Sequence, residues 1–508
     1  MQQKSPSFSR WFTQPLDRVA LIAMVILGVL MALLVLSGDH TAPRVRQFSW
    51  QDKQVGATDS AFLLTFSRPM DRTSVEDNLR VVPPLPGKIS WAGRRMAYTL
   101  EAPAPYGTAF QVELQDARDR FAQTNARPIH PFTGRFRSRD RAFVYLGLEG
   151  EEAGRLVLEN LTRQEHKILT PASLAVLSFK PYPQGDRILF SATDRAVINQ
   201  SQLEQKLYTV STGIDPQSPD QLLTNTRDRP VEAPPQPVGT VTLVLDSQDY
   251  QNLKFDLSPD GQKIVLQRAN RNNPADFGLW LIEADQPPKP LKTQPGGDFL
   301  IAPDSNSIAM SQGQGLAILP LESGADPLSF LAKYGLILAF SNDGSQAATV
   351  QFGAELNNPI ESLYVVDNAG NETNVLQTDG SLVSAEFDPA HPVLYVLVAD
   401  RIPNPELYLE QPYLVAINLE TAERTDLLKL PIQRDLQMSL APDGLGILLD
   451  QVTSAEGVEP GVAQSEDGSA IVSSRLWFLP LVLDETGNPS PTEPQALPLM
   501  GLNPRWLP

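Results

Sequence analysis

Residues 253–269 read LKFDLSPDGQKIVLQRA, and the interpretation of most of the chain depends on this stretch. Two apolar-rich runs flank Ser258-Pro259-Asp260-Gly261. An Asp-Gly pair between such runs is typical of a tight β-hairpin, because glycine accepts a positive φ. The stretch therefore predicts two antiparallel strands joined by a short turn.

The same pattern recurs through residues 141–508. A strand that ends in Pro or an equivalent residue is expected at 174–181, 253–259, 298–303, 336–342, 382–389 and 436–442. A second strand follows each turn, and the third strands open at Leu207, Leu279, Leu316, Leu363, Leu414 and Leu476. The fourth strands are expected to end near Leu223, Leu291, Leu328, Leu376, Leu428 and Leu497. Four strands repeated at roughly regular spacing predict a β-propeller.

The two ends of this region complement each other. The first unit, at 142–148, 155–159 and 166–170, has second, third and fourth strands but no first strand. The final residues, GLNPRWLP at 501–508, resemble a first strand with nothing after it. We expect the two to pair near Trp506 and Phe143, which would complete a seventh blade. Closing the ring in this way would also remove exposed sheet edges.

Residues 43–139 show short alternating runs separated by turn residues. Strands are expected at 61–66, 89–91, 96–100, 109–114 and 132–136, with a hairpin turn at 92–95. Several such strands in about 95 residues predict a β-sandwich. The whole chain is thus expected to be all-β after one N-terminal helix.

Two resemblances add to this interpretation. The run LTFSRPMD at 64–71, with PYGTAFQV at 105–112, resembles the signature of bacterial Ig-like domains of the S-layer-associated type. That family's D-x-x-G turn would fall at 116–121, where the final glycine is missing. The resemblance implies an Ig-like spacer or adhesion module without enzymatic activity.

The run SPDGQKI at 258–264 resembles the motif of the TolB-like (PD40, WD40-like) propeller family. This resemblance covers roughly residues 141–508, the expected seven-bladed ring, and it implies a propeller used for protein–protein contacts in the cell envelope. Related propellers also precede peptidase domains, but the sequence contains no Gly-x-Ser-x-Gly nucleophile elbow.

Residues 19–36 (VALIAMVILGVLMALLVL) carry no charged side chain. Eighteen such residues form a helix roughly 27 Å long, close to the hydrocarbon thickness of a bilayer. We therefore expect a transmembrane signal-anchor helix at 19–37, with a cleaved signal peptide as the alternative. Arg18 directly precedes the apolar run, which favours a cytoplasmic tail at 1–18. The expected location is the cell membrane, single-pass, with residues 43–508 periplasmic or at the cell surface.

The charge is unevenly distributed along the chain. Residues 1–140 contain 18 Lys and Arg against 12 Asp and Glu, whereas residues 141–508 contain 23 against 47. The respective balances are +6 and −24. An acidic surface of this size repels phosphate backbones, which argues against nucleic-acid binding. The basic N-terminal part would lie favourably near anionic lipid headgroups.

We assign no residue of the sequence to catalysis, cofactor binding or metal binding. The chain has no cysteine and four histidines, His40, His130, His166 and His391, which are scattered along it. His391 is interpreted as a turn residue. Long polar insertions at 225–239, 454–473 and 485–494 are candidates for either binding loops or surface decoration.

These observations favour a membrane-anchored binding or scaffolding protein whose propeller engages an envelope protein or polymer. The alternative is a carbohydrate hydrolase or lyase with acidic residues at the propeller axis. A mechanical surface-layer component is a third hypothesis.

Overall fold

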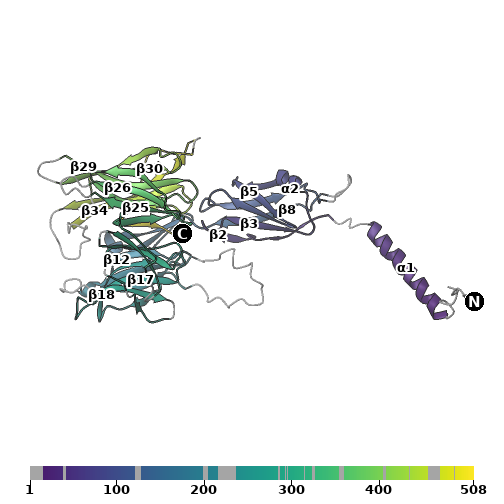
Figure 1. The fold of residues 1–508 in the computed structure, drawn as a ribbon, viewed down its shortest axis with the longest axis horizontal. Helices are drawn as coiled ribbons and strands as arrows, with labels where there is room; N and C mark the ends of the chain where they lie inside the picture. The colour runs from purple at the N-terminus through teal and green to yellow at the C-terminus, as the bar shows by residue number, and fades with distance from the viewer. Residues whose placement is uncertain are drawn as a thin grey trace, which may run out of the picture.

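The computed structural model describes residues 15–37, 42–120, 128–197, 204–214, 236–283, 286–291, 293–294, 296–313, 315–322, 327–353, 360–403, 408–433, 435–455, 470–484 and 487–508. Within these ranges, the side chains of 15–18, 33–37, 453–455 and 470–472 are not described. An N-terminal helix, a β-sandwich and a β-propeller follow one another along the longest axis of the molecule (Figure 1). The expected all-β fold after one N-terminal helix is confirmed.

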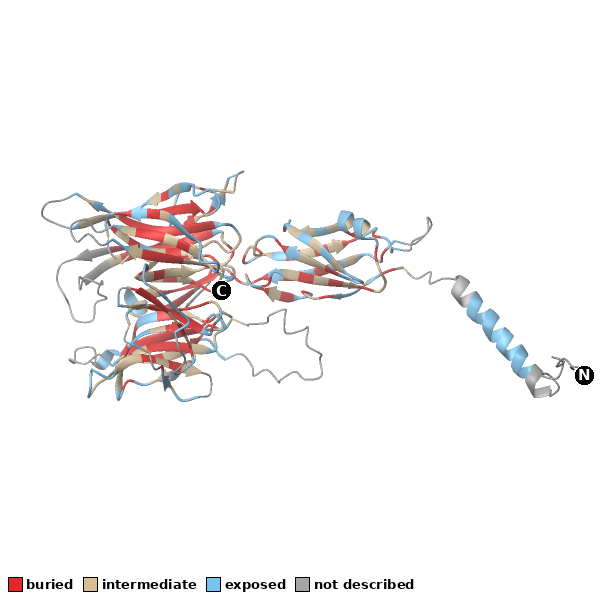
Figure 2. Ribbon diagram, in the orientation of Figure 1, coloured by how far each residue is buried: buried red, intermediate tan, exposed pale blue. Residues whose placement is uncertain are grey.

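Helix α1 spans Pro15–Ser37, and it begins four residues before the expected start. Its described side chains, from Val19 to Ala32, are all exposed (Figure 2). Among the helices of the described residues, none combines the length and hydropathy of a membrane span. The span expected at 19–37 therefore stays a prediction, and the tail at 1–18 lies largely outside the described residues.

The sandwich consists of two four-stranded sheets, ordered β1-β3-β6-β5 and β2-β8-β7-β4. The strands are β1 Val45–Phe48, β2 Lys53–Val55, β3 Ala61–Phe66, β4 Leu79–Val82, β5 Gly87–Ala92, β6 Arg95–Leu100, β7 Ala109–Leu114 and β8 Phe132–Ser138. Strand β3 alternates between half-buried and buried residues, so one side of it faces the core. The expected hairpin at 92–95 is confirmed, with Gly93 at a φ of +62°.

Aromatic side chains fill the space between these two sheets. The Phe136 ring stacks on Phe110 at 5.0 Å and meets Trp50 edge-on, also at 5.0 Å between ring centroids. Each such pair adds about 0.5–1.5 kcal/mol to the effect of burial alone. A short helix, α2 (Arg72–Asn78), was not expected from the sequence; Asp71 caps it by accepting from the Ser74 amide.

The propeller contains five separate four-stranded sheets among the described residues. These are β12 Leu174–Pro181, β13 Arg187–Asp194, β14 Lys206–Ser211 and β15 Val241–Leu245; β16 Tyr250–Leu257, β17 Lys263–Asn270, β18 Phe277–Glu283 and β19 Lys289–Pro290; β20 Phe299–Ile301, β21 Ser307–Gln312, β22 Gly315–Pro320 and β23 Ser329–Leu331; β24 Leu336–Phe340, β25 Gln346–Phe352, β26 Glu361–Asp367 and β27 Glu372–Thr378; and β28 Ser381–Phe387, β29 Val393–Ile402, β30 Leu409–Asn418 and β31 Arg424–Lys429.

The remaining propeller strands form one seven-stranded sheet, ordered β11-β10-β9-β37-β34-β33-β32. Its members are β9 Ala142–Gly147, β10 Leu156–Asn160, β11 Glu165–Ile168, β32 Met438–Leu440, β33 Gly446–Ala455, β34 Ala470–Pro480 and β37 Gln495–Trp506. The first half of β37 pairs with β34, and its second half pairs with β9. One strand thus completes both the last four-stranded unit and the first.

This pairing closes the propeller at the expected place. Trp506 lies opposite Phe143 in the ladder, and their rings meet edge-on at 5.4 Å between centroids. Trp506 is 6% exposed and also meets Phe478 of β34. The sequence suggested a separate first strand at 501–508, whereas the structure has one continuous strand from Gln495.

Two details of the repeats differ from expectation. The fourth strand of the sheet that begins with β12 is β15, whereas the residues around Leu223 lie outside the described residues. The described part of the insertion at 485–494 is folded: β36 (Pro489–Ser490) pairs with β35 (Val482–Leu483). Asn488 of this hairpin donates to Glu423, which ties it to the neighbouring β30–β31 turn.

The turns after the first strands lie on the side of the propeller that faces the sandwich. Asp443, in the turn between β32 and β33, accepts hydrogen bonds from the Tyr106 amide at 2.9 Å and from Arg141 at 2.6 Å. Arg139 donates to the Pro508 carbonyl at 2.8 Å. The sandwich is therefore bonded to the propeller at the place where the ring closes.

We predict that Trp506→Ala lowers the free energy of unfolding of the propeller by about 3–5 kcal/mol, because a large buried aromatic side chain is lost at the closure. Phe352→Ala is the control, since this side chain is 51% exposed and its loss should cost less than about 0.5 kcal/mol. Chemical denaturation followed by circular dichroism measures both. Equal losses in the free energy of unfolding would show that packing at the closure stabilises the propeller no more than an exposed side chain does.

We also predict that Asp443→Asn loosens the junction between sandwich and propeller. The amide of Tyr106 should exchange with deuterium about tenfold faster, because a buried charge-assisted acceptor is replaced by a weaker one. Asp343→Asn is the matched control. Asp343 occupies the same turn position, but its side chain accepts hydrogen bonds from Ser341 and Ser345 of its own turn. An unchanged exchange rate at Tyr106 would contradict this role of Asp443.

Candidate binding surface around the propeller axis

The first strands of successive sheets lie at the inside of the ring. Strand β16 contacts β20, β20 contacts β24, β24 contacts β28, and β28 contacts β32. Fourth strands form the opposite edge of each sheet. Residues on the first strands therefore surround the axis.

Equivalent residues on these strands can be identified from the turn that follows each strand. The Ser258 amide donates to the Lys263 carbonyl at 2.9 Å, and Tyr182, Ala302, Ser341, Asp388, Ala441 and Leu507 make the same kind of bond. The residues two places earlier form a set that we call the inner ring: Arg505, Lys180, Asp256, Leu300, Ala339, Glu386 and Ser439.

Charged members of the inner ring bind neighbouring sheets. Lys180 pairs with Asp256 of the next sheet, and Asp256 accepts from the Ile301 amide of the sheet after that at 2.7 Å. Glu386 likewise accepts from the Leu440 amide of the next sheet at 2.9 Å. These carboxylates satisfy backbone donors and hold successive sheets together.

The densest polar contacts of the inner ring lie beside the closure. Arg505 donates to the Met438 carbonyl at 3.2 Å and to the Gln437 side chain at 3.1 Å, and its guanidinium lies 4.0 Å from Glu386. Asp450, from β33, accepts from the Gln437 and Asn503 amides, each at 2.7 Å. One buried carboxylate thus joins the first strand of one unit to the strand that closes the ring.

Burial changes the proton affinity of both carboxylates. Desolvation raises the pKa of Asp450 to about 6, although the amides of Gln437 and Asn503 oppose the shift. Glu386 keeps 30% of its side-chain surface exposed, but desolvation by the surrounding protein raises its pKa to about 7. Arg505 and the Leu440 amide oppose that shift. Glu386 is therefore the inner-ring carboxyl that can hold a proton near neutral pH.

The first strands also carry exposed apolar residues three places before the inner ring, farther from the turns that face the sandwich. Leu177, Leu253 and Val383 are the extra residues of β-bulges at equivalent places, and they are 45%, 36% and 40% exposed. Lys254, next to Leu253, forms an ion pair at 2.6 Å with Asp298 of the adjacent sheet. We call these five residues the far rim.

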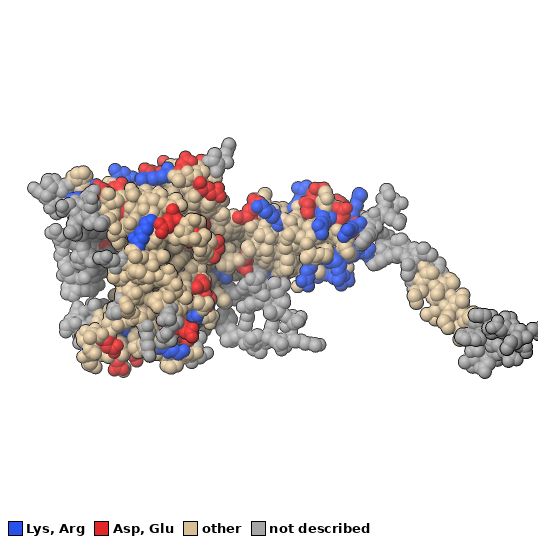
Figure 3. Space-filling view, viewed as in Figure 1, with Lys and Arg blue, Asp and Glu red and all other residues tan. Residues whose placement is uncertain are grey.

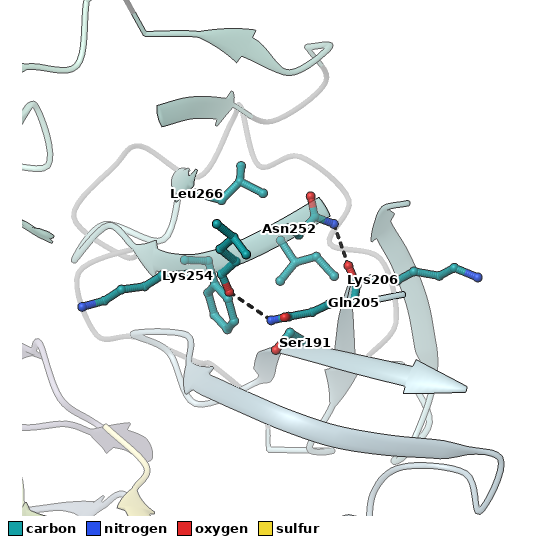
Figure 4. Close-up of a pocket in the computed structure, with 9 residues that line it drawn as sticks. Ser191, Gln205, Lys206, Asn252, Lys254 and Leu266 are labelled. Carbon is teal, nitrogen blue, oxygen red and sulfur yellow. Dashed lines mark hydrogen bonds between the residues drawn. The ribbon is translucent and has the colours of Figure 1, made fainter. Parts of the chain in front are cut away.

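A small pocket lies next to the far rim, between β14 and β16 (Figure 4). Asn252 donates to the Gln205 carbonyl at 2.8 Å, and the Gln205 side chain donates to the Leu253 carbonyl at 3.0 Å. Ser191, 1% exposed, has a hydroxyl without a hydrogen-bond partner among the described residues. The pocket encloses only about 10 Å³, room for about one water molecule, which is far below the range typical of small-molecule sites.

The described residues contain no group of three or more His, Asp or Glu side chains placed to hold a metal ion. His391 lies in an Asx turn in which Asp388 accepts from the His391 amide, in agreement with its predicted turn role. His166 contacts Glu152 and Glu159 at 2.7 Å each, a cluster that sequence spacing did not indicate. His40 lies outside the described residues.

No protein-family model matches this chain, and no curated protein matches it either. Among solved structures, TolB from Acinetobacter baumannii is 14% identical over 70% of this chain and 80% of its own length, with a TM-score of 0.37. Prolyl oligopeptidase B from Galerina marginata is 9% identical over 85% of this chain and 52% of its own, with a TM-score of 0.41. Hydrazine synthase from Kuenenia stuttgartiensis is 11% identical over 53% of this chain and 72% of its own, with a TM-score of 0.34.

We predict that Asp450 makes propeller stability depend on pH. Because its folded pKa of about 6 exceeds the unfolded value of 3.8, its contribution is complete below pH 3.8 and is lost as the pH rises through 6. The free energy of unfolding of the wild type, relative to that of Asp450→Asn, should therefore fall by up to about 3 kcal/mol between pH 4 and pH 7.

Chemical denaturation at several pH values measures this difference. Asp426→Asn is the control, because the Asp426 side chain is 69% exposed and should leave the pH profile unchanged. A pH-independent difference for Asp450→Asn would show that the carboxyl titrates alike in the folded and unfolded chain.

Proposed function

We propose that this chain is a membrane-anchored extracytoplasmic protein with a binding or scaffolding role. In this proposal α1 is a single-pass anchor and the sandwich is an Ig-like spacer. The propeller sheets are seven blades of one closed ring, and the far rim engages an envelope protein or polymer. The domain limits would be 1–18, 19–37, 43–139 and 141–508.

The apolar surface of α1 supports the anchor. Large hydrophobic side chains from Val19 to Met31 are exposed around the helix, and residues 19–36 carry no charge. A helix that is apolar on every side is stable where lipid, rather than water, surrounds it.

The sheet topology supports the Ig-like spacer and the seven-bladed ring. Two antiparallel-rich sheets around an aromatic core are the architecture of Ig-like sandwiches. Five four-stranded sheets and two further units that share β37 add up to seven units, the number that a seven-bladed propeller requires.

The observation that carries the binding role is the far rim. Its three apolar side chains are held exposed by bulged inner strands of the propeller, and one of them, Leu253, adjoins the charged pair of Lys254 and Asp298. Exposed apolar groups rimmed by polar residues are typical of interaction sites. These residues lie farther than the inner ring from the turns that bond to the sandwich, so a partner would approach them from the side of the propeller away from the spacer.

One observation favours the alternative, a carbohydrate hydrolase or lyase. Glu386, near the axis, would retain its proton near neutral pH, as a general acid must. Against this role, both Asp450 oxygens accept backbone amides, so its carboxylate is committed to the closure. The binding role is therefore better supported.

We predict that a photo-crosslinker at Ser178, an exposed residue next to Leu177, captures a defined envelope partner in intact cells. Leu177→Ser/Val383→Ser should lower the captured yield about tenfold or more, because apolar anchors dominate such interfaces. Leu243→Ser/Phe330→Ser removes two equally exposed apolar residues from outer strands and should leave the yield unchanged. Equal yields from both double variants would exclude the far rim as the binding surface. A loss of polysaccharide cleavage by Glu386→Gln would favour the enzyme instead.

A further inference from the structure

The sandwich carries a concentration of arginines at the end where the chain enters from α1. The segments that form this end are 44–46, 67–80, 93–95 and 116–120. They contain nine arginines, Arg44, Arg46, Arg68, Arg72, Arg80, Arg94, Arg95, Arg118 and Arg120, and we call this surface the arginine end. Figure 3 shows Lys and Arg gathered over the part of the sandwich nearest the helix.

Backbone hydrogen bonds hold the loops of the arginine end together. The Phe66 amide donates to the Arg94 carbonyl, and the Ser67 amide donates to the Arg44 carbonyl, both at 2.9 Å. The Asp71 amide donates to the Arg118 carbonyl at 2.9 Å as well. These loops start from strands of both sheets, so the arginines are presented by a fixed scaffold.

The arginines of this end outnumber its carboxylates. The carboxylates in the same segments are Asp71, Glu76, Asp77, Asp116 and Asp119, which leaves a balance of +4. Asp119 pairs with Arg68 at 3.2 Å, and Asp71 caps α2. Eight of the nine arginines are exposed, all except Arg68.

The position of the arginine end matches a membrane surface. Only six residues, 38–43, lie between Ser37, the last residue of α1, and Arg44, so seven Cα–Cα steps join the two. A chain of that length spans at most about 25 Å. If α1 crosses a bilayer, the arginine end cannot be far from the headgroup layer, where any anionic headgroups attract basic groups within about one Debye length.

We infer that the arginine end docks on anionic phospholipid headgroups of the membrane that holds α1. Guanidinium groups suit this ligand because they bind phosphate through paired N–H donors. Docking would hold the sandwich against the bilayer and direct the far rim away from it. This inference rests on the proposed membrane anchor.

The test uses the full chain with one engineered cysteine, which would be its only thiol. Ala92→Cys places an environment-sensitive fluorophore at an exposed position beside Arg94. The labelled protein is reconstituted into vesicles of phosphatidylcholine alone or with about one-third phosphatidylglycerol. We expect a blue shift only with phosphatidylglycerol, reversed by raising the salt from about 0.05 M to 0.5 M.

Matched charge variants identify the surface. Arg94→Gln/Arg118→Gln should lower the ratio of docked to undocked protein about tenfold, since two headgroup contacts are lost. Lys88→Gln/Arg135→Gln removes two exposed charges from other parts of the sandwich and should leave that ratio unchanged. An identical response to both lipids, or an equal effect of both double variants, would overturn the inference.

Flotation of the same samples separates this inference from the proposed anchor. Failure to float with phosphatidylcholine vesicles would refute the anchor. Arginine-dependent flotation with phosphatidylglycerol in that case would still support lipid docking. A fluorophore shift that occurs in native membranes but not with pure lipid would identify an acidic protein as the ligand and overturn the inference.

Discussion

The pairing of β37 with β9 is the contact on which the propeller depends. Strand β37 also pairs with β34, so without this strand the unit formed by β9, β10 and β11 would lack its innermost strand and the unit formed by β32, β33 and β34 would lack its outermost one. Both would expose unpaired backbone donors and acceptors along a sheet edge. The polar contacts of Asp450 and Arg505 cluster at this junction, and so does the aromatic contact between Trp506 and Phe143.

The same junction sets the position of the sandwich. Asp443 accepts from Arg141 of the chain that enters the propeller and from the Tyr106 amide of the sandwich. Arg139 reaches the carbonyl of Pro508, which follows the closing strand. Ring closure and domain orientation therefore share their bonding groups.

Much of this architecture could be predicted from local sequence. Asp-Gly turns and alternating apolar residues located the first strands, and the strand 174–181 was predicted to the residue. In these turns Gly261, Gly344 and Gly444 adopt the positive φ that glycine favours, whereas Ser305 adopts it in the turn between β20 and β21. Helix α2 was missed although Asp71 is a good N-cap, because seven residues are too few to show helical periodicity. The inner ring and the far rim could not be predicted, since they depend on which residues meet across sheets and on bulges that shift the register.

The shared strand also has a consequence for how the molecule is made. Trp506 and Phe143 are neighbours in space, yet more than three hundred residues of sequence lie between them. Long-range pairing of this kind slows folding, because the entropy of a very large loop must be lost before the contact forms. During synthesis, the strands that await β37 would stay open until that late segment emerges. Throughout this interval the nascent ring would be most vulnerable to proteases and to aggregation, and most in need of chaperones.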